Sequence, residues 1–282
     1  MITLLTDFGL ADHYVAAMKG VILSICPAVV LADITHGVAP YAVLEAAYTL
    51  SQVWACFPPG TIHVVVVDPG VGSSRRPLLA EAGGHYFIAP DNGVLTMVFD
   101  AVPGVTVRHI TSVCYFRHPV SSTFHGRDIF APVAAHLASG IAPEEFGELL
   151  EQPVLLELAK PVRIAKNHWK GVVLKIDHFG NIITNFDVAT FHRASTRPFE
   201  VTLAGHPVRQ FHPSYSAQTS DQPFVVSGSS GFLEVSVREA DAAARLGVSA
   251  GSPVSIRWIP PVSVGSRQYP LDIDEPQVPR CL

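Results

Sequence analysis

The sequence predicts an α/β N-terminal domain with a mostly parallel sheet, followed by a small C-terminal domain with an antiparallel, β-barrel-like sheet. Two observations support this fold class. In the first half of the chain, short apolar β-branched runs alternate with helical apolar spacing, as in parallel sheets covered on both faces. After Pro161, short strands separated by turn signals dominate. We therefore expect one domain at residues 1–162 and a second at residues 163–282.

Three predicted strands of the first half each run directly into a carboxylate. The strands are residues 2–6, 29–32 and 63–67, and the acids that follow them are Asp7, Asp33 and Asp68. Ligands of open α/β sheets bind beyond the carboxyl ends of the strands. A single acid at a loop start is an ordinary solvated residue, but three in equivalent positions predict a polar small-molecule site.

Helices are expected between these strands, and the second half is expected to be almost entirely β. Helical apolar spacing runs from Asp12 to Pro27, from Pro40 to Pro58 and from Arg127 to Gly140, and a further strand covers residues 85–89. In the second half, the predicted strands are residues 171–176, 180–184, 231–237 and 253–256, with a short helix at 239–246.

Composition excludes several classes of function. The net charge of -5 and the absence of a Lys/Arg cluster give no support for nucleic-acid binding. The apolar stretch at residues 20–32 is too short to span a bilayer, and the N-terminus lacks the basic region of a signal peptide, so we expect a soluble, cytoplasmic protein. Four scattered cysteines indicate neither a zinc site nor a disulfide framework, and no metal is expected. The hydrophobic content of 48% is consistent with burial of surface in an oligomer.

Three segments contain residue types suited to chemistry. Asp68 is followed by two glycines that allow close backbone approach to a ligand, and by Arg75 seven residues later. This glycine pattern is not the longer dinucleotide fingerprint, so no Rossmann cofactor is indicated. His125 precedes a predicted helix, where a capping role is common, and residues 177–181 fit a simple hairpin turn. None of the three assigns a function by itself.

Taken together, five segments in order resemble the S-adenosylmethionine hydroxide adenosyltransferases, which are S-adenosylmethionine hydrolases related to fluorinase and chlorinase. The segments are residues 6–9 (Thr-Asp-Phe-Gly), 68–72 (Asp-Pro-Gly-Val-Gly), 89–93 (Ala-Pro-Asp-Asn-Gly), 123–128 (Thr-Phe-His-Gly-Arg-Asp) and 177–181 (Asp-His-Phe-Gly-Asn). The resemblance extends from residue 1 to about residue 260 and implies the same two-part architecture.

The resemblance implies that water or hydroxide attacks the ribose C5′ of S-adenosyl-L-methionine and releases adenosine and L-methionine. S-adenosyl-L-methionine is then the substrate, and no cofactor is expected. The resemblance also implies a homotrimer in which the N-terminal domain of one subunit and the C-terminal domain of its neighbour share each site.

The resemblance further assigns roles to individual residues. Asp68, Arg75 and His125 match the catalytic set around the attacking water, and either Asp68 or His125 could be the general base. Asp7 matches the acid that holds the ribose hydroxyls, and Asp177 the acid near the methionine ammonium. The other residues that match substrate contacts are Tyr41, Phe124, Phe179, Asn181, Ser229, Glu234 and Val237, of which Phe179 and Asn181 match adenine contacts.

Two alternative functions remain open. A halide-dependent, chlorinase-like adenosyl transferase would avoid an ionised acid beside its halide, so Asp68 disfavours it, as does His125-Gly126 where the halogenases resemble Tyr-Ser. A non-catalytic sensor of S-adenosylmethionine or adenosine has no need of a set that activates water, so Asp68, Arg75 and His125 disfavour it.

Overall fold

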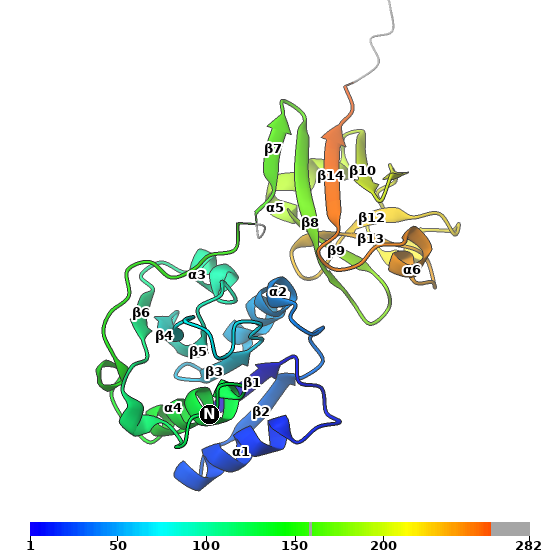
Figure 1. Ribbon diagram of the computed structural model, residues 1–282. Coiled ribbons are helices and arrows are strands. Elements are labelled where there is room, and N and C mark those ends of the chain that lie inside the picture. Colours follow the sequence, from blue (N-terminus) through cyan, green and yellow to red (C-terminus); the bar gives the residue numbers. More distant parts are fainter. Residues whose placement is uncertain (158–159, 261–282) are drawn as a thin grey trace, which may run out of the picture.

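The computed structural model describes residues 1–157 and 160–260 and consists of two halves, each built around one sheet (Figure 1). The N-terminal half contains a six-stranded sheet of order β2-β1-β3-β5-β4-β6. Its strands are β1 (Ile2–Thr6), β2 (Leu31–Thr35), β3 (Ile62–Val66), β4 (Pro77–Ala82), β5 (His85–Pro90) and β6 (Thr106–His109). The pairs β2-β1, β1-β3 and β3-β5 are parallel, whereas β4 is antiparallel to both β5 and β6. The predicted mostly parallel α/β sheet is confirmed.

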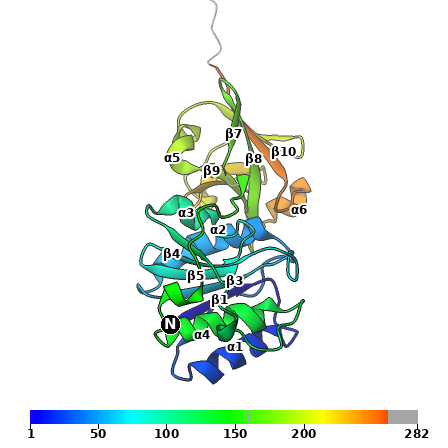
Figure 2. The same cartoon turned by 60° about the vertical axis from the view of Figure 1, so that its left-hand side comes forward.

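Helices cover both faces of this sheet. Helices α1 (Tyr14–Ile25) and α4 (Ala131–Ala138) pack on one face, and α2 (Val43–Val53) and α3 (Thr96–Ala101) pack on the other (Figure 2). The alternation of β1 explains the two cores, because Leu4 belongs to the cluster under α1 and α4 while Leu5 belongs to the cluster under α2. The three predicted helical patterns correspond to α1, α2 and α4. Helix α3 and the strands β4 and β6 were missed.

The prediction for Asp33 is wrong. Strand β2 extends over Leu31–Thr35, so Asp33 lies inside this edge strand rather than beyond its carboxyl end. Its carboxylate pairs with Lys19 Nζ at 2.7 Å and with His36 Nε2 at 3.1 Å. Asp33 therefore has a local structural role.

The C-terminal half is an eight-stranded sheet of order β11-β10-β14-β8-β9-β13-β12, with β7 paired to β8. Its strands are β7 (Val162–Ala165), β8 (His168–Ile176), β9 (Ile182–Asp187), β10 (Phe199–Leu203), β11 (His206–Val208), β12 (Phe224–Ser227), β13 (Phe232–Ser236) and β14 (Pro253–Trp258). All of these pairs are antiparallel. The short helices α5 (Val188–Phe191) and α6 (Ala242–Leu246) accompany them.

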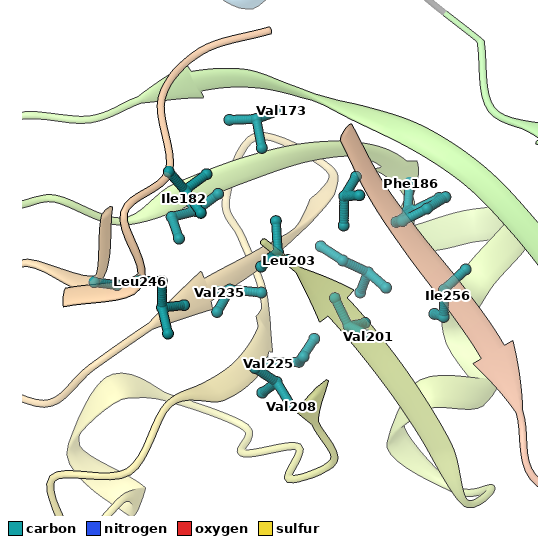
Figure 3. Close-up of a cluster of buried hydrophobic side chains, with 14 of the residues drawn as sticks. Val173, Ile182, Phe186, Val201, Leu203, Val208, Val225, Val235, Leu246 and Ile256 are labelled. Carbon is teal, nitrogen blue, oxygen red and sulfur yellow. The ribbon is translucent and has the colours of Figure 1, made fainter. Parts of the chain in front are cut away.

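Strands far apart in the sequence share one interior in this half. Side chains such as Val173, Leu203, Val225 and Ile256 point toward one another from four different strands (Figure 3). The expected barrel-like antiparallel sheet is confirmed.

The two halves meet where α2 lies against β8 and β9. Tyr48 of α2 packs with Val172, Leu174 and Ile183 in one apolar cluster. At the border of this cluster, Lys175 Nζ pairs with Glu45 Oε1 at 3.0 Å. Strand β7 begins at residue 162, but the division into residues 1–162 and 163–282 stays a prediction, because residues 261–282 lie outside the described part of the chain.

Candidate active site

A pocket of about 330 Å³ opens at the carboxyl ends of β1 and β3, and we call it the N-terminal pocket. The residues that line it are Asp7, Phe8, Tyr14, Pro40, Tyr41, Val66, Asp68, Val71, Thr123, Phe124, His125 and Gly126. Five of the predicted site residues are among them, namely Asp7, Tyr41, Asp68, Phe124 and His125. This position agrees with the rule that ligands of α/β sheets bind beyond the carboxyl ends of the strands.

Asp68, Arg75 and His125 form one connected group, the catalytic set predicted from the sequence. Arg75 Nε donates to both carboxylate oxygens of Asp68 at 2.9 Å, and Arg75 Nη2 also contacts Asp68 Oδ2. The same Nη2 lies 2.8 Å from His125 Nδ1. The side chains of Arg75 and Asp68 are only 9% and 5% exposed, so this ion pair is shielded from water. Such burial strengthens the electrostatic interactions within the group.

The contact with Arg75 fixes the protonation of His125. A guanidinium can only donate hydrogen bonds, so His125 Nδ1 must accept one and carries no proton. The imidazole is then neutral, with its proton on Nε2. Burial lowers the pKa of His125, and the nearby positive charge of Arg75 lowers it further, while Asp68 and Asp128 act in the opposite direction. His125 therefore offers an N–H donor at Nε2.

One donor of Arg75 is uncommitted. Arg75 Nη1 is buried and makes no hydrogen bond to any residue that the structure describes. The guanidinium also lies over the ring of Phe130, with its carbon 5.1 Å from the ring centroid. A ligand atom or water that enters the group would meet a donor that has lost its hydration, which favours a partner with negative charge.

Glycines allow the loops of the catalytic set to approach each other. Gly72 has φ +77°, and a Cβ there would lie 2.2 Å from the carbonyl oxygen of Ser122. The loop after Asp68 therefore packs directly on the loop before His125. His125 itself precedes a π-helical turn, Gly126–Phe130, of the kind often found at functional sites.

Asp128 fixes the loop that leads to His125. Its buried carboxylate accepts hydrogen bonds from Arg127 Nε at 2.7 Å, from Arg117 Nη1 at 3.2 Å and from the backbone N–H of Ser121 at 2.9 Å. These contacts depress the pKa of Asp128, although burial opposes them. The acid of the segment 123–128 is thus structural.

Asp7 and an aromatic wall complete the N-terminal pocket. Asp7 Oδ2 accepts a hydrogen bond from the backbone N–H of Tyr41 at 2.8 Å. The ring of Phe124 packs edge-on against Phe8 and Tyr14, with centroid separations of 5.9 and 5.1 Å. Phe8 and Tyr14 were not predicted as site residues, and no feature of a single sequence separates them from ordinary core aromatics.

A second pocket, of about 730 Å³, lies in the C-terminal half, and we call it the C-terminal pocket. The residues that line it are Phe179, Asn181, Tyr215, Ser216, Val237, Arg238, Glu239, Ala240 and Asp241. Phe179, Asn181 and Val237 were predicted as substrate contacts, whereas Tyr215 and Arg238 were missed.

A tight turn presents Phe179 and Asn181. Asp177 Oδ1 accepts from the backbone N–H groups of Phe179 and Asn181 at 2.9 and 2.8 Å, and Asp177 Oδ2 accepts from Asn181 Nδ2 at 2.8 Å. Gly180 has φ +84°, and a Cβ there would lie 2.4 Å from Asp241 Cγ. Asp177 therefore orients the turn as well as being near the pocket.

Glu234 is buried behind this pocket. Its Oε2 accepts a hydrogen bond from the Tyr215 hydroxyl at 2.6 Å, and its Oε1 lies 3.4 Å from Ser230 Oγ. Burial raises the pKa of Glu234. In the described chain, Glu234 and Ser229 both lie outside the two sets of lining residues. Glu234 acts on the pocket wall through Tyr215.

The two pockets have no described lining residue in common. Within one chain, the predicted site residues are therefore divided between two separate surfaces. Among residues 1–157 and 160–260, no group of three or more His, Cys, Asp or Glu side chains is arranged to hold a metal ion. The same residues contain no helix that is both long and apolar enough to cross a membrane.

Comparisons with known proteins find matches to both halves of the chain. The model of the SAM hydroxide adenosyltransferase N-terminal domain matches residues 2–147, and that of the C-terminal domain matches residues 171–255. The chain is 35% identical to proteins named (R)-S-adenosyl-L-methionine hydrolase from Salinispora tropica, over 90% of this chain and 97% of the relative, and from Thermus thermophilus, over 89% and 97%. A fluorinase of Nocardia brasiliensis is 31% identical over 66% of this chain and 70% of its own length.

A solved structure has the same fold. The crystal structure of an uncharacterized conserved protein from Thermotoga maritima superimposes with a TM-score of 0.82 at 38% identity, over 91% of this chain and all of that one. Both family models, the related sequences and this structure lead to one conclusion: the chain belongs to the SAM hydroxide adenosyltransferase family.

Proposed function

We propose that the protein hydrolyses S-adenosyl-L-methionine to adenosine and L-methionine. The observation that supports this best is the buried Asp68–Arg75–His125 group at the carboxyl edge of the sheet, in a chain 35% identical to several proteins named (R)-S-adenosyl-L-methionine hydrolase. In the proposed step, the oxygen of water forms a bond to C5′ while the C5′–S bond breaks and its electron pair goes to sulfur. A neutral thioether leaves, so this step needs neither an acid for the leaving group nor a cofactor.

We assign the general base to Asp68. The lone pair of His125 Nδ1 is occupied by Arg75, so His125 offers only its Nε2–H to an incoming water. Asp68 is ionised against Arg75, and a carboxylate oxygen has more than one lone pair. The water proton goes to Asp68, while His125 and Arg75 donate hydrogen bonds to the oxygen that attacks. Both donors are fixed before the reaction, as electrostatic catalysis requires.

The substrate contacts follow from the two pockets. Asp7 uses one oxygen on Tyr41, which leaves the other for the ribose hydroxyls. The aromatic wall at Phe124 encloses the nucleoside in the N-terminal pocket. We also assign Phe179, Asn181 and Val237, which line the C-terminal pocket, to adenine. Asp177, Ser229 and Glu234 line neither pocket; following the family resemblance, we assign Asp177 to the methionine ammonium and Ser229 and Glu234 to further substrate contacts.

We propose a homotrimer in which the N-terminal pocket of one subunit faces the C-terminal pocket of its neighbour. The separation of the pockets within one chain supports this arrangement. So does the exposure of Phe179 and Tyr41, which are 74% and 73% exposed in the single chain although both are large and apolar. A cytoplasmic location stays a prediction.

Product analysis tests the proposal. The purified protein is incubated with S-adenosyl-L-methionine in ¹⁸O-labelled water. The nucleosides are then separated by chromatography, and their masses are measured by mass spectrometry. We expect labelled adenosine and an equal amount of L-methionine, formed at least about 100-fold more slowly by the Asp68→Asn variant. Binding of S-adenosyl-L-methionine without any adenosine would favour the sensor, and 5′-chloro-5′-deoxyadenosine as the main product would favour the halide-dependent transferase.

A further inference from the structure

Residues 90–93 lie between the two chain segments that deliver Asp68 and Arg75. The resemblance identified this segment but assigned it no role. It begins with Pro90, the last residue of β5, which is opposite Pro77 of β4. One step further along, the backbone N–H of Asp91 donates to the carbonyl oxygen of Arg76 at 2.8 Å. Arg76 directly follows Arg75, so the segment borders the catalytic set.

The carboxylate of Asp91 is buried and has a different partner on each oxygen. Its Oδ2 accepts from Arg76 Nε at 2.7 Å, and its Oδ1 accepts from the backbone N–H of Val154 at 2.7 Å. Arg76 Nη2 in turn donates to the carbonyl oxygen of Gln152 at 3.1 Å. This ion pair, in which Asp91 is buried and Arg76 is 34% exposed, therefore connects the residue after Arg75 to residues 152–156, the linker between the two halves.

Asn92 holds the other catalytic segment. Its Nδ2 donates to the carbonyl oxygen of Val67 at 2.9 Å, and its Oδ1 accepts from the backbone N–H of Val94 at 3.2 Å. Val67 directly precedes Asp68. The backbone N–H of Asp91 and the side chain of Asn92 thus hold the backbone beside Arg75 and Asp68, respectively. The carboxylate of Asp91 in addition holds the side chain of Arg76.

The linker also crosses this segment closely. Gly93 has φ +89°, and a Cβ there would lie 2.7 Å from the side chain of Leu156. The backbone N–H of Leu156 donates to Thr96 Oγ1 at 2.9 Å. Residues 152–156 therefore pack against the same turn that borders Asp68 and Arg75.

We propose that Asp91 and Asn92 are positioning residues for the Asp68–Arg75–His125 group and that they couple its geometry to the docked linker. The proposal rests on the proposed hydrolysis for its kinetic consequence. A displacement of about 1 Å in an aligned catalytic group can reduce the rate on the order of 100-fold. Arg75 must contact Asp68 and His125 at once, so it tolerates little movement of its backbone.

The test compares Asp91→Asn with Asp100→Asn. The first variant keeps the size of the side chain and an acceptor for Val154 but removes the charge that pairs with Arg76. The control removes another acid, Asp100, whose carboxylate forms an exposed pair with Lys160 at 2.7 Å and is not among the described partners of Arg76. We expect kcat for adenosine formation to fall on the order of 10- to 100-fold in Asp91→Asn, with the Kd of adenosine changed less than about threefold. Asp100→Asn should match the wild type.

A spectroscopic measurement separates this proposal from the proposed function. Long-range ¹H–¹⁵N spectra report the tautomer and the titration of His125. In Asp91→Asn, a loosened Arg75 should let the titration midpoint of His125 rise toward that of an ordinary histidine, since Arg75 and burial hold its pKa down against Asp68 and Asp128. The Arg76→Gln variant, which leaves Asp91 bonded to Val154, provides the same test if Asp91→Asn does not fold.

The outcomes are distinct. If wild type forms adenosine but kcat and the His125 midpoint of both variants match those of Asp100→Asn, the positioning role is overturned and the pair only fastens the linker. If wild type forms no adenosine, the proposed function fails, and the His125 midpoint alone decides whether Asp91 positions Arg75. Equal losses of kcat and adenosine affinity would also overturn the proposal, because they would indicate a general distortion of the pocket.

Discussion

Replacement of Asp68 by asparagine is the most direct test of the proposed chemistry. The side chain keeps its size but can no longer accept a proton. General-base catalysis contributes on the order of 10²- to 10⁴-fold, which corresponds to about 3–5 kcal/mol in the activation free energy. We expect kcat to fall within this range, while the affinity for adenosine changes little, because Asp7 and the aromatic wall hold the nucleoside.

The same substitution also affects stability. Asp68 accepts from Arg75 Nε on both oxygens, and the pair is buried. Loss of one partner of a buried ion pair costs about 3–5 kcal/mol of unfolding free energy. The melting temperature must therefore be measured together with kcat, so that a smaller fraction of folded protein is not mistaken for a lower catalytic rate. Asp221→Asn, which breaks the exposed pair of Asp221 with Arg245, serves as the control and should change neither quantity.

The assay is chromatography of adenosine at saturating S-adenosyl-L-methionine, on variants shown to be folded at the assay temperature. An Asp68→Asn enzyme that is folded and retains more than about a tenth of the wild-type kcat would refute the assignment of the base, since even the lower end of the expected effect is larger. A His125 variant would then need to account for the proton transfer.

Four further predictions concern other parts of the molecule. Gly72→Ala should destabilise the fold more than Gly104→Ala in thermal melts, because both glycines have positive φ but only a Cβ at Gly72 would meet another atom within 4 Å, the Ser122 carbonyl oxygen at 2.2 Å; equal losses would contradict this. Light scattering should show a particle of three chains, and an active monomer would contradict the shared sites. Adenosine should remain the sole nucleoside product in molar chloride, since a chloride about 4 Å from Asp68 is repelled by roughly 4 kcal/mol at an effective dielectric of about 20, of which Arg75 offsets only a part. Between pH 7.5 and pH 5, chemical denaturation should show a loss of about 2 kcal/mol from His63 alone, and a flat profile would contradict its neutral state.

The sign of the last effect follows from the burial of His63. His63 is fully buried, and desolvation and the neighbouring His85 lower its pKa to about 3. Its Nδ1 lies 2.7 Å from Thr3 Oγ1, and its Nε2 lies 3.1 Å from His85 Nδ1. In the unfolded chain the imidazole titrates near 6.5. Below that pH the unfolded state binds the extra proton, so the contribution is complete above the unfolded pKa and is lost as the pH falls.

The sequence predicted those elements whose buried residues are mostly apolar. Strands β1 and β3 are buried along their whole length and consist mainly of apolar residues, and α1 and α2 have helical apolar spacing, so their existence was clear. Strand β2 was placed too early, because it is an edge strand whose half-exposed residues include Asp33. Because β2 contains polar residues, the apolar pattern did not reveal its full length. Asp33, which the sequence placed after the strand, lies within it.

The sequence indicated which residues belong to the candidate site but not how their side chains contact one another. The family resemblance indicated Asp68, Arg75 and His125, but only the geometry shows that Arg75 occupies His125 Nδ1, the contact on which our proposal of Asp68 as the base rests. The bond between Tyr215 and Glu234 joins residues that are distant in sequence and on different elements. A single sequence contains no signal for such a pair, since register and loop conformation create it.

The chemistry explains why a divided site suits this reaction. Water is always present, so the enzyme contributes alignment with the C5′–S bond and a partly dry environment rather than the nucleophile itself. The Asp68–Arg75–His125 group is already buried and connected within one chain. Phe179, in contrast, is exposed on its turn and has an open face. In the trimer that we propose, the Asp68–Arg75–His125 group is therefore prepared before assembly, and assembly would add Phe179 as a wall for the adenine.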